Sequence, residues 1–121
     1  MKLILPIPPT INHYYTRTNR GMFINQKGVS YRQLVNLVVK KEYPKHNTID
    51  KPVKVKIDFY PPDKRKRDVD NVLKCLLDSL TKANVYRDDS LIIDLRIRKM
   101  EMIRNAGKIE VVVNGISETE R

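Results

Sequence analysis

The spacing of apolar residues divides the chain into two helices and four strands. Helical spacing predicts an amphipathic helix over residues 27–43 and a second over 70–83. Prolines 6, 8 and 9 end a short first strand, because proline cannot donate to a sheet ladder, and a loop follows it. Alternation of apolar and polar residues, or a short apolar run, predicts strands over residues 2–7, 53–60, 91–100 and 108–114.

The same pattern predicts which side chains face inward. Asp70 is expected to cap the second helix, and Asn84 to end it in the left-handed conformation. In the strand over 91–100 the inward positions are expected to be Ile93, Leu95 and Ile97. The apolar stripe of the second helix consists of Leu73, Leu76, Leu77 and Leu80.

These elements predict an α/β fold with a mixed sheet of about four to five strands and two main helices. The last two strands are expected to form a C-terminal β-hairpin around a turn at residues 105–107. At 121 residues and 14.2 kDa the chain is about one domain long. We expect a single domain over 1–121, with residues 116–121 as a frayed tail.

Composition narrows the possible classes of protein. No apolar run approaches the ~20 residues that cross a bilayer, and the apolar stretch at the N-terminus is too short for a signal peptide. We therefore expect a cytoplasmic protein with no membrane partner. Because Cys75 is the single cysteine, an internal disulfide and a cysteine-built zinc site are both excluded, and any metal must bind oxygen ligands.

The net positive charge indicates a polyanionic partner, but the distribution of acids does not fit simple binding. The formal net charge is +10. Residues 51–67 hold seven basic residues and two acids, whereas residues 68–89 hold five aspartates. Bare carboxylates repel phosphates unless a cation lies between them, so the adjacency argues against a protein that merely coats DNA.

The segment from Arg67 to Lys74 carries the most chemical information. If Asp68 to Asp70 is extended, both carboxylates point to one side, where a hard divalent cation such as Mg²⁺ offsets their repulsion. Lys74 lies one helical turn after Asp70 and can reach the same space. A purely structural alternative stays open, in which Asp70 caps the helix, Asp68 pairs with arginines and Lys74 pairs with Asp70 or Asp78.

A second acidic pair, Asp88 and Asp89, precedes the strand over 91–100. In an unbroken strand Asp89 has the parity of the inward residues and Asp88 points away, which makes Asp89 the better ligand. A tight turn at the two aspartates is the alternative, and a bulge would also break the parity.

The motif Arg67-Asp68-Val69-Asp70-Asn71, followed by Lys74 and Asp88-Asp89, resembles the RusA family of Holliday junction resolvases. The opening Leu5-Pro6-Ile7-Pro8-Pro9 with Tyr14-Tyr15 is similar to that family's N-terminus, so the resemblance spans nearly the whole chain. Asn84 departs from it, standing where glycine follows the second helix.

The resemblance implies a homodimeric, Mg²⁺-dependent endonuclease that is specific for four-way DNA junctions and is often encoded by phages or prophages. Lys74 is implied to be a catalytic lysine, with Asn71 beside it. The implied metal-binding and catalytic carboxylates are Asp68, Asp70 and Asp89. The residues expected to bind nucleic acid are Lys64, Arg65, Lys66, Arg67 and Asn71.

Two other functions are alternatives, and the sequence does not separate a junction resolvase from the second of them. One is a non-catalytic nucleic-acid-binding protein, and the other is a nuclease for flaps or linear ends that shares the metal site. His13 and His46 receive no role, because neither has an acid at metal-ligand spacing. Of Tyr14 and Tyr15, alternation predicts that one packs into the core and one is available to stack on bases.

Overall fold

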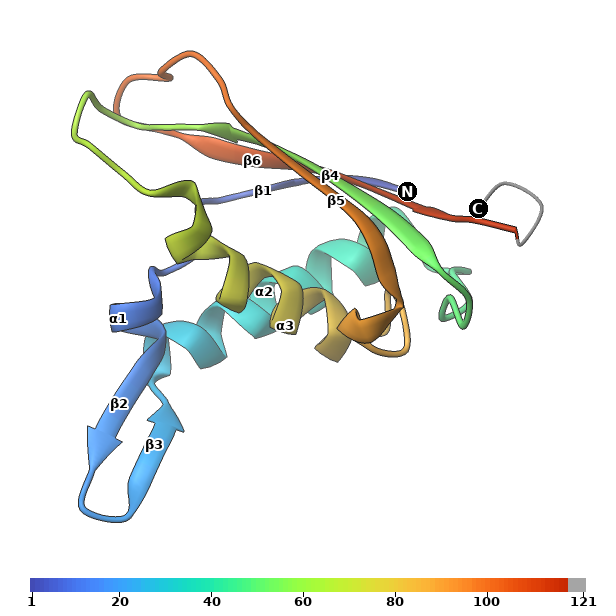
Figure 1. Cartoon of the computed structure of the whole chain (residues 1–121), viewed down its shortest axis with the longest axis horizontal. Coiled ribbons are helices and arrows are strands. Elements are labelled where there is room, and N and C mark those ends of the chain that lie inside the picture. Colours follow the sequence, from blue (N-terminus) through green and yellow to red (C-terminus); the bar gives the residue numbers. More distant parts are fainter. Residues whose placement is uncertain (118–121) are drawn as a thin grey trace.

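A computed structural model shows two layers, a four-stranded sheet and a pair of helices that cover one of its faces (Figure 1). The structure describes residues 1–117, apart from the side chains at positions 11 and 12. The strand order is β1-β6-β4-β5, which confirms the predicted α/β class and mixed sheet. The strands are β1 (Lys2–Leu5), β4 (Val53–Tyr60), β5 (Ile92–Lys99) and β6 (Lys108–Gly115).

Strand β4 is the centre of the sheet and determines which face is buried. Its apolar positions Val53, Val55, Ile57 and Phe59 are buried, while the residues between them face away from the helices. β4 pairs with β5 in parallel and with β6 in antiparallel fashion, and β1 pairs with the other edge of β6. The alternation predicted for residues 53–60 is confirmed.

The sequence correctly predicts two successive C-terminal strands, but the prediction that they pair as a hairpin is wrong. β5 and β6 run antiparallel, but β4 lies between them, so they share no ladder. The physical reason is the helix between β4 and β5. A strand-helix-strand unit returns the chain alongside the first strand in parallel, and this places β5 beside β4.

The two main helices are α2 (Gln26–Glu42) and α3 (Leu73–Lys82). The Asn25 side chain caps α2 by accepting a 3.1 Å hydrogen bond from the Gly28 amide. A 3₁₀ turn, η1 (Val69–Val72), precedes α3, so Asp70 is not its N-cap and makes no capping bond. At the other end Asn84 adopts a φ of 60°, the left-handed conformation predicted for it.

Strand β5 forms one edge of the sheet, and the alternation of inward and outward side chains is interrupted near its start. Its register against β4 shifts, so that Val53 pairs with Ile92 and Lys54 with Asp94. Ile97 packs against the core as predicted, whereas Ile93 and Leu95 are each 41% exposed. Ile93 is the unpaired residue of the irregularity, so the inward position predicted for it is wrong. Leu95 is in register with the buried Val55 and lies on the same face as Ile97, as predicted, but it stays exposed because β5 is an edge strand.

Residues 11–24 form structure where the sequence predicts a loop. A short helix α1 (Ile11–Tyr14) leads into a hairpin of β2 (Tyr15–Thr18) and β3 (Gly21–Ile24), which projects from the body in Figure 1. The hairpin lacks a buried face, so its sequence lacks the alternation that indicates a strand.

The predicted C-terminal tail, residues 116–121, is packed at its first position. Ile116 is buried, and its amide donates a 2.7 Å hydrogen bond to the Pro52 carbonyl, so the chain is still packed at this position. The rest of the predicted tail, residues 118–121, lies outside the described residues. No helix in the described part of the chain is both long and apolar enough to span a membrane.

Burial should make Cys75 a protected thiol. The side chain lies in the core, and burial raises its pKa to about 11, so about one thiol in a thousand is ionised at pH 8. We predict that a disulfide reagent such as DTNB labels Cys75 slowly in the native protein and rapidly in denaturant. Because folding raises this pKa above 9.0, the thiol's contribution to stability should be lost as pH rises from about 9 to about 11. Rapid native labelling would contradict this burial.

Candidate functional site

Two carboxylates at η1 are exposed: Asp68, just before the turn, and Asp70, within it. Asp68 has extended backbone angles, whereas Asp70 lies within the 3₁₀ turn, so the condition of an extended segment from Asp68 to Asp70 is not met. Among the described residues neither side chain makes a hydrogen bond or ion pair. The structural alternative, in which Asp70 caps the helix and Asp68 pairs with arginines, is not what the structure shows.

A cleft of about 400 Å³ opens beside Asp68. Two cations of the preceding loop, Lys66 and Arg67, line it together with Asn71. The structure thus brings four of the predicted site residues to one hollow. The remaining lining residues are Ile7, Thr10, Phe59 and Val72.

The loop before Asp68 is organised by Asp63. The Arg67 guanidinium donates two hydrogen bonds to the Asp63 carboxylate, and the Arg65 amide donates a third of 2.9 Å. The Arg67 bond, followed by the Arg65 amide, holds the pKa of Asp63 well below its usual range. Arg65 Nε also lies 3.8 Å from Asp63 Oδ2, and the side chains of Lys64, Arg65 and Lys66 are exposed.

Lys74 is anchored one turn along α3. Its Nζ lies 3.2 Å from Asp78 Oδ1, which confirms the Asp78 version of the predicted i,i+4 pair. This bond raises the pKa of Lys74, and the charge of Asp89 adds to the shift. The ammonium is therefore held in its charged form.

Asp78 also joins the three helices, which the sequence analysis did not predict. Its Oδ2 accepts a 3.0 Å hydrogen bond from the Tyr14 hydroxyl of α1 and lies 3.7 Å from Arg32 Nη2 of α2. Arg32 Nε in turn donates to the Tyr14 hydroxyl at 2.9 Å. The signal available in the sequence was a lone acid on the polar flank of a leucine-striped helix, but its partners lie 46 and 64 residues away.

Asp89 lies in a second 3₁₀ turn, η2 (Asp89–Leu91), which Figure 1 shows toward the other end of α3 from η1. The parity argument for Asp89 therefore fails, because a turn precedes the strand. Asp88 accepts a 3.1 Å bond from the Ser90 amide, as in the tight-turn alternative. Within residues 1–117, no three His, Cys, Asp or Glu side chains are gathered to hold a metal, so Asp68, Asp70 and Asp89 are not brought together.

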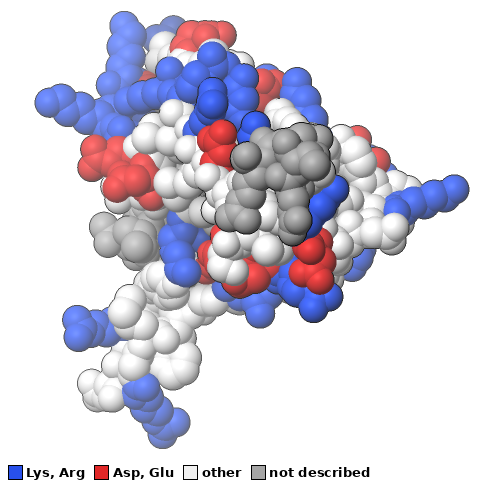
Figure 2. Space-filling model, turned by 45° about the vertical axis from the view of Figure 1, so that its right-hand side comes forward, with Lys and Arg blue, Asp and Glu red and all other residues white. Residues whose placement is uncertain are grey.

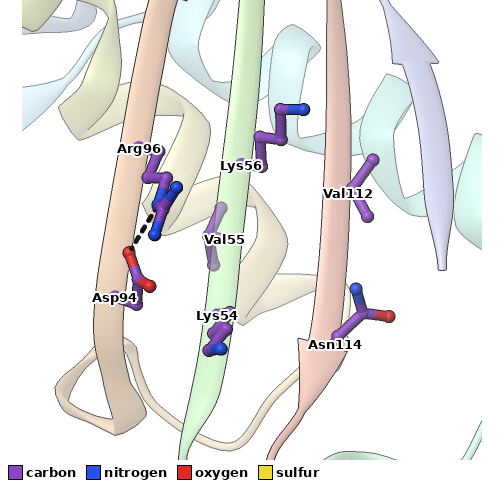
Figure 3. A pocket seen from close by; sticks show the side chains of 7 residues that line it. All are labelled: Lys54, Val55, Lys56, Asp94, Arg96, Val112 and Asn114. Carbon is purple, nitrogen blue, oxygen red and sulfur yellow. Dashed lines mark hydrogen bonds and ion pairs between the residues drawn. The ribbon is translucent and has the colours of Figure 1, made fainter.

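Apart from Lys51, the basic residues of the segment 51–67 lie on two different elements, strand β4 and the loop that follows it. Lys54 and Lys56 lie on β4 and face away from the helices, where they border a hollow of about 290 Å³ with Arg96 and Asp94 (Figure 3). The uncovered sheet face is thus a second cationic surface, apart from the loop.

The tyrosine and histidine predictions are resolved by burial. Tyr14 is fully buried, and Tyr15 is half-buried with its ring edge-on to Tyr14 at 4.8 Å, so Tyr14 is the core residue of the two. His46 has a structural contact, because its Nε2 lies 2.8 Å from the Val85 carbonyl oxygen. His13 is exposed.

Comparison with known proteins identifies the family. A family model described as endodeoxyribonuclease RusA matches residues 6–114, which include all of the candidate residues above. The chain belongs to the RusA family. A crossover junction endodeoxyribonuclease RusA of Shigella sonnei is 38% identical over 112 residues, covering 92% of this chain and 91% of the relative.

Other RusA relatives agree with this assignment. The protein of the same description from Escherichia coli K12 is 37% identical over 112 residues, again with 92% of this chain covered. A RusA of Enterobacteria phage 82 is 38% identical over the same length, which agrees with the viral occurrence that the resemblance implied.

The Asp78 contact makes a prediction that does not depend on activity. Asp78→Asn removes the charge that keeps Lys74 protonated, so Lys74 should be acylated faster at pH 9. Peptide mass spectrometry measures the labelled fraction, with Lys82 as internal reference.

A matched control is Asp58→Asn. The Asp58 side chain is 16% exposed against 17% for Asp78, but it pairs with Arg98 and does not contact Lys74. This variant should leave Lys74 labelling unchanged. Equal labelling in both variants would show that Asp78 does not control the lysine.

Proposed function

We propose that this member of the RusA family is an endodeoxyribonuclease that resolves four-way DNA junctions by paired, symmetric nicks. Family membership supports the reaction class. The main observation behind the proposed site is that Asp68 and Asp70, next to a cationic cleft, are exposed and make no ion pair or side-chain hydrogen bond with any described residue. Exposed carboxylates next to a phosphate-binding surface weaken binding unless a cation bridges them to the phosphate, so the arrangement favours catalysis over simple binding.

The donors on η1 fit Mg²⁺ in chemistry. Mg²⁺ prefers hard oxygen ligands, commonly one or two carboxylates together with waters and substrate phosphate oxygens, and two such carboxylates are available here. In our proposal Asp68 and Asp70 would hold the ion. Asp89 of η2, the third carboxylate implied by the resemblance, is not gathered with them in the described residues. When bound, Mg²⁺ polarises the phosphoryl group and lowers the pKa of water.

The other residues bind and orient the DNA. Lys66 and Asn71 would contact the backbone within the cleft, and Lys64 and Arg65 from the loop outside it. Arg67 would act mainly by shaping the loop, because Asp63 already occupies its guanidinium. Lys74, which Asp78 keeps charged, would stabilise the negative charge that develops on the phosphate.

We propose a homodimer as the working form. A four-way junction has approximate two-fold symmetry, so a two-fold dimer presents one site to each of two opposed strands. Sedimentation with and without junction measures this directly. A species of 14.2 kDa under both conditions would rule out paired nicking by a dimer.

The deciding experiment compares three substrates. A synthetic four-way junction, a flap and a linear duplex are each incubated with Mg²⁺ or with EDTA. We expect symmetric nicks in the junction alone, and only with Mg²⁺. Equal cutting of the flap would favour the flap-nuclease alternative, and binding without cutting would favour a non-catalytic protein.

Asp70→Asn separates the metal-binding role from a structural one. Because Asp70 is exposed and makes no capping bond, stability should change by less than about 0.5 kcal/mol. Cleavage should be largely lost, while binding in EDTA should be at least as tight as for the wild type, since a repulsive charge is removed. Asp50→Asn, at an exposed acid paired with Arg87, is the control and should cut normally. A folded, fully active Asp70→Asn variant would contradict the proposed metal-binding role of Asp70.

Neutralising the loop tests where the DNA backbone lies. Changing Lys64, Arg65 and Lys66 to glutamine should weaken junction binding and reduce the log-log salt slope by about 0.9 for each lost phosphate contact. The control changes three exposed cations to glutamine, with the same loss of charge: Lys40 and Lys41 in the last turn of α2 and Lys45 just after it. If both triple variants had the same slope, the loop would not be the contact.

A further inference from the structure

The hairpin of β2 and β3, residues 15–24, projects from the body as an arm (Figure 1). In Figure 2 the same arm extends at lower left, largely uncharged and flanked by basic side chains. The two strands form a sheet of their own, separate from the main sheet. An isolated two-stranded hairpin is marginally stable in water, so an arm of this kind calls for a functional explanation.

The arm exposes its largest apolar side chains. Phe23 is 53% exposed and Met22 is 61% exposed. Phe23 stands opposite Thr16, so its neighbour across the strands is small and the ring is not covered from the side. A solvent-facing phenylalanine beside threonine offers a free aromatic face.

Charge on the arm favours a polyanion. Arg17 and Arg20 are exposed, and neither makes an ion pair with any described residue. Arg17 lies opposite Met22, and Arg20 is in the two-residue connection between the strands. The first acid in the chain is Glu42, so no carboxylate of the N-terminal segment opposes a phosphate near the arm.

The base of the arm is fixed to the body. The Asn25 amide donates a 2.9 Å hydrogen bond to the Tyr14 carbonyl, which closes the hairpin. Gly28 of α2 lies so close to Tyr14 and Ile24 that a Cβ there would be 2.5 Å from the tyrosine ring. The arm therefore leaves the body in a set direction and does not hang from a linker.

The base is also linked to Lys74. The Tyr14 hydroxyl binds one oxygen of Asp78, and Lys74 binds the other, so a single carboxylate separates the root of the arm from the lysine. Anything held by the arm is thereby held at a fixed offset from that lysine.

We propose that the arm enters the crossover of a four-way junction, where Phe23 stacks on a base pair at the branch point and Arg17 and Arg20 contact the flanking phosphates. The inference rests on the proposed function and extends it to the choice of substrate. Inside a duplex an apolar wedge must first unstack a base step, which costs a few kcal/mol per step. At a branch point the stack is already interrupted, so the same contact favours the junction over the duplex.

The test uses the full-length protein in EDTA, so that binding is measured without cleavage. Phe23→Ala should weaken junction binding by about 5-fold to about 150-fold, the range given by loss of one base-aromatic stack, and should change duplex binding by less than about twofold. Phe23→Trp should restore junction binding. Leu37→Ala is the matched control, because Leu37 is a 66% exposed apolar residue of α2, outside the arm, and it should bind like wild type.

A second readout reports on the bases directly. A 2-aminopurine placed at the crossover should change fluorescence when wild type or Phe23→Trp binds, and should respond less to Phe23→Ala. Circular dichroism melting checks that the variants fold, as expected for substitutions at an exposed side chain.

Three outcomes would overturn the inference. In the first, Phe23→Ala binds and perturbs the junction like wild type. In the second, it loses junction and duplex binding equally. In the third, sedimentation shows that it has changed from dimer to monomer, which would make the arm a contact between copies of the chain. Failure of the proposed function itself is seen separately, in wild type that neither prefers nor cuts the junction.

Discussion

One partly buried carboxylate, that of Asp78, links the three helices that position Lys74 and the arm. Asp78 is only 17% exposed, and its two oxygens are shared among side chains of α1, α2 and α3. A carboxylate removed from water is tolerated only when it is paired, so Tyr14, Arg32 and Lys74 are constrained together. The same bond raises the pKa of Tyr14, in addition to the larger effect of burial, and keeps its hydroxyl protonated as a donor. The direction of the arm and the position of Lys74 thus follow from one charge.

Because the helices cover only one face of the sheet, the cations of the open face are separated from the carboxylates of η1 and η2. Alternation along β4 places Val55 and Ile57 under the helices and Lys54 and Lys56 on the open face. The carboxylates of η1 and η2 lie at the ends of α3, in the helix layer. These site carboxylates and the cations of the open sheet face therefore lie in different layers, whereas the acids of the sheet itself, Asp94, Asp58 and Glu110, pair with Arg96, Arg98 and Lys108. A net charge of +10 can attract DNA without neutralising the acids within the protein.

Strong periodicity was enough to predict the main elements, because β4, β6 and both long helices each bury one continuous face. The parallel pairing of β4 and β5 was also open to prediction, since a helix predicted between two strands is a strand-helix-strand unit. The arm was not, because neither face of residues 15–24 is buried throughout. Sequence motifs pointed to Asp68, Asp70 and Lys74, but not to Asp78, whose role depends on partners distant in the chain.

Asp63 explains how Asp68 and Asp70 remain unpaired beside four consecutive cations. Arg67 is the cation adjacent to Asp68 in sequence, and its rigid guanidinium would match that carboxylate well. Instead it binds Asp63, four residues earlier, and the pKa of Asp63 is lowered mainly by this bond. Arg67, the cation best suited to bind Asp68, is thus already paired within the loop. An arginine paired with Asp68 would compete with a divalent cation for the same oxygens, so Asp63 preserves the charge that a metal needs.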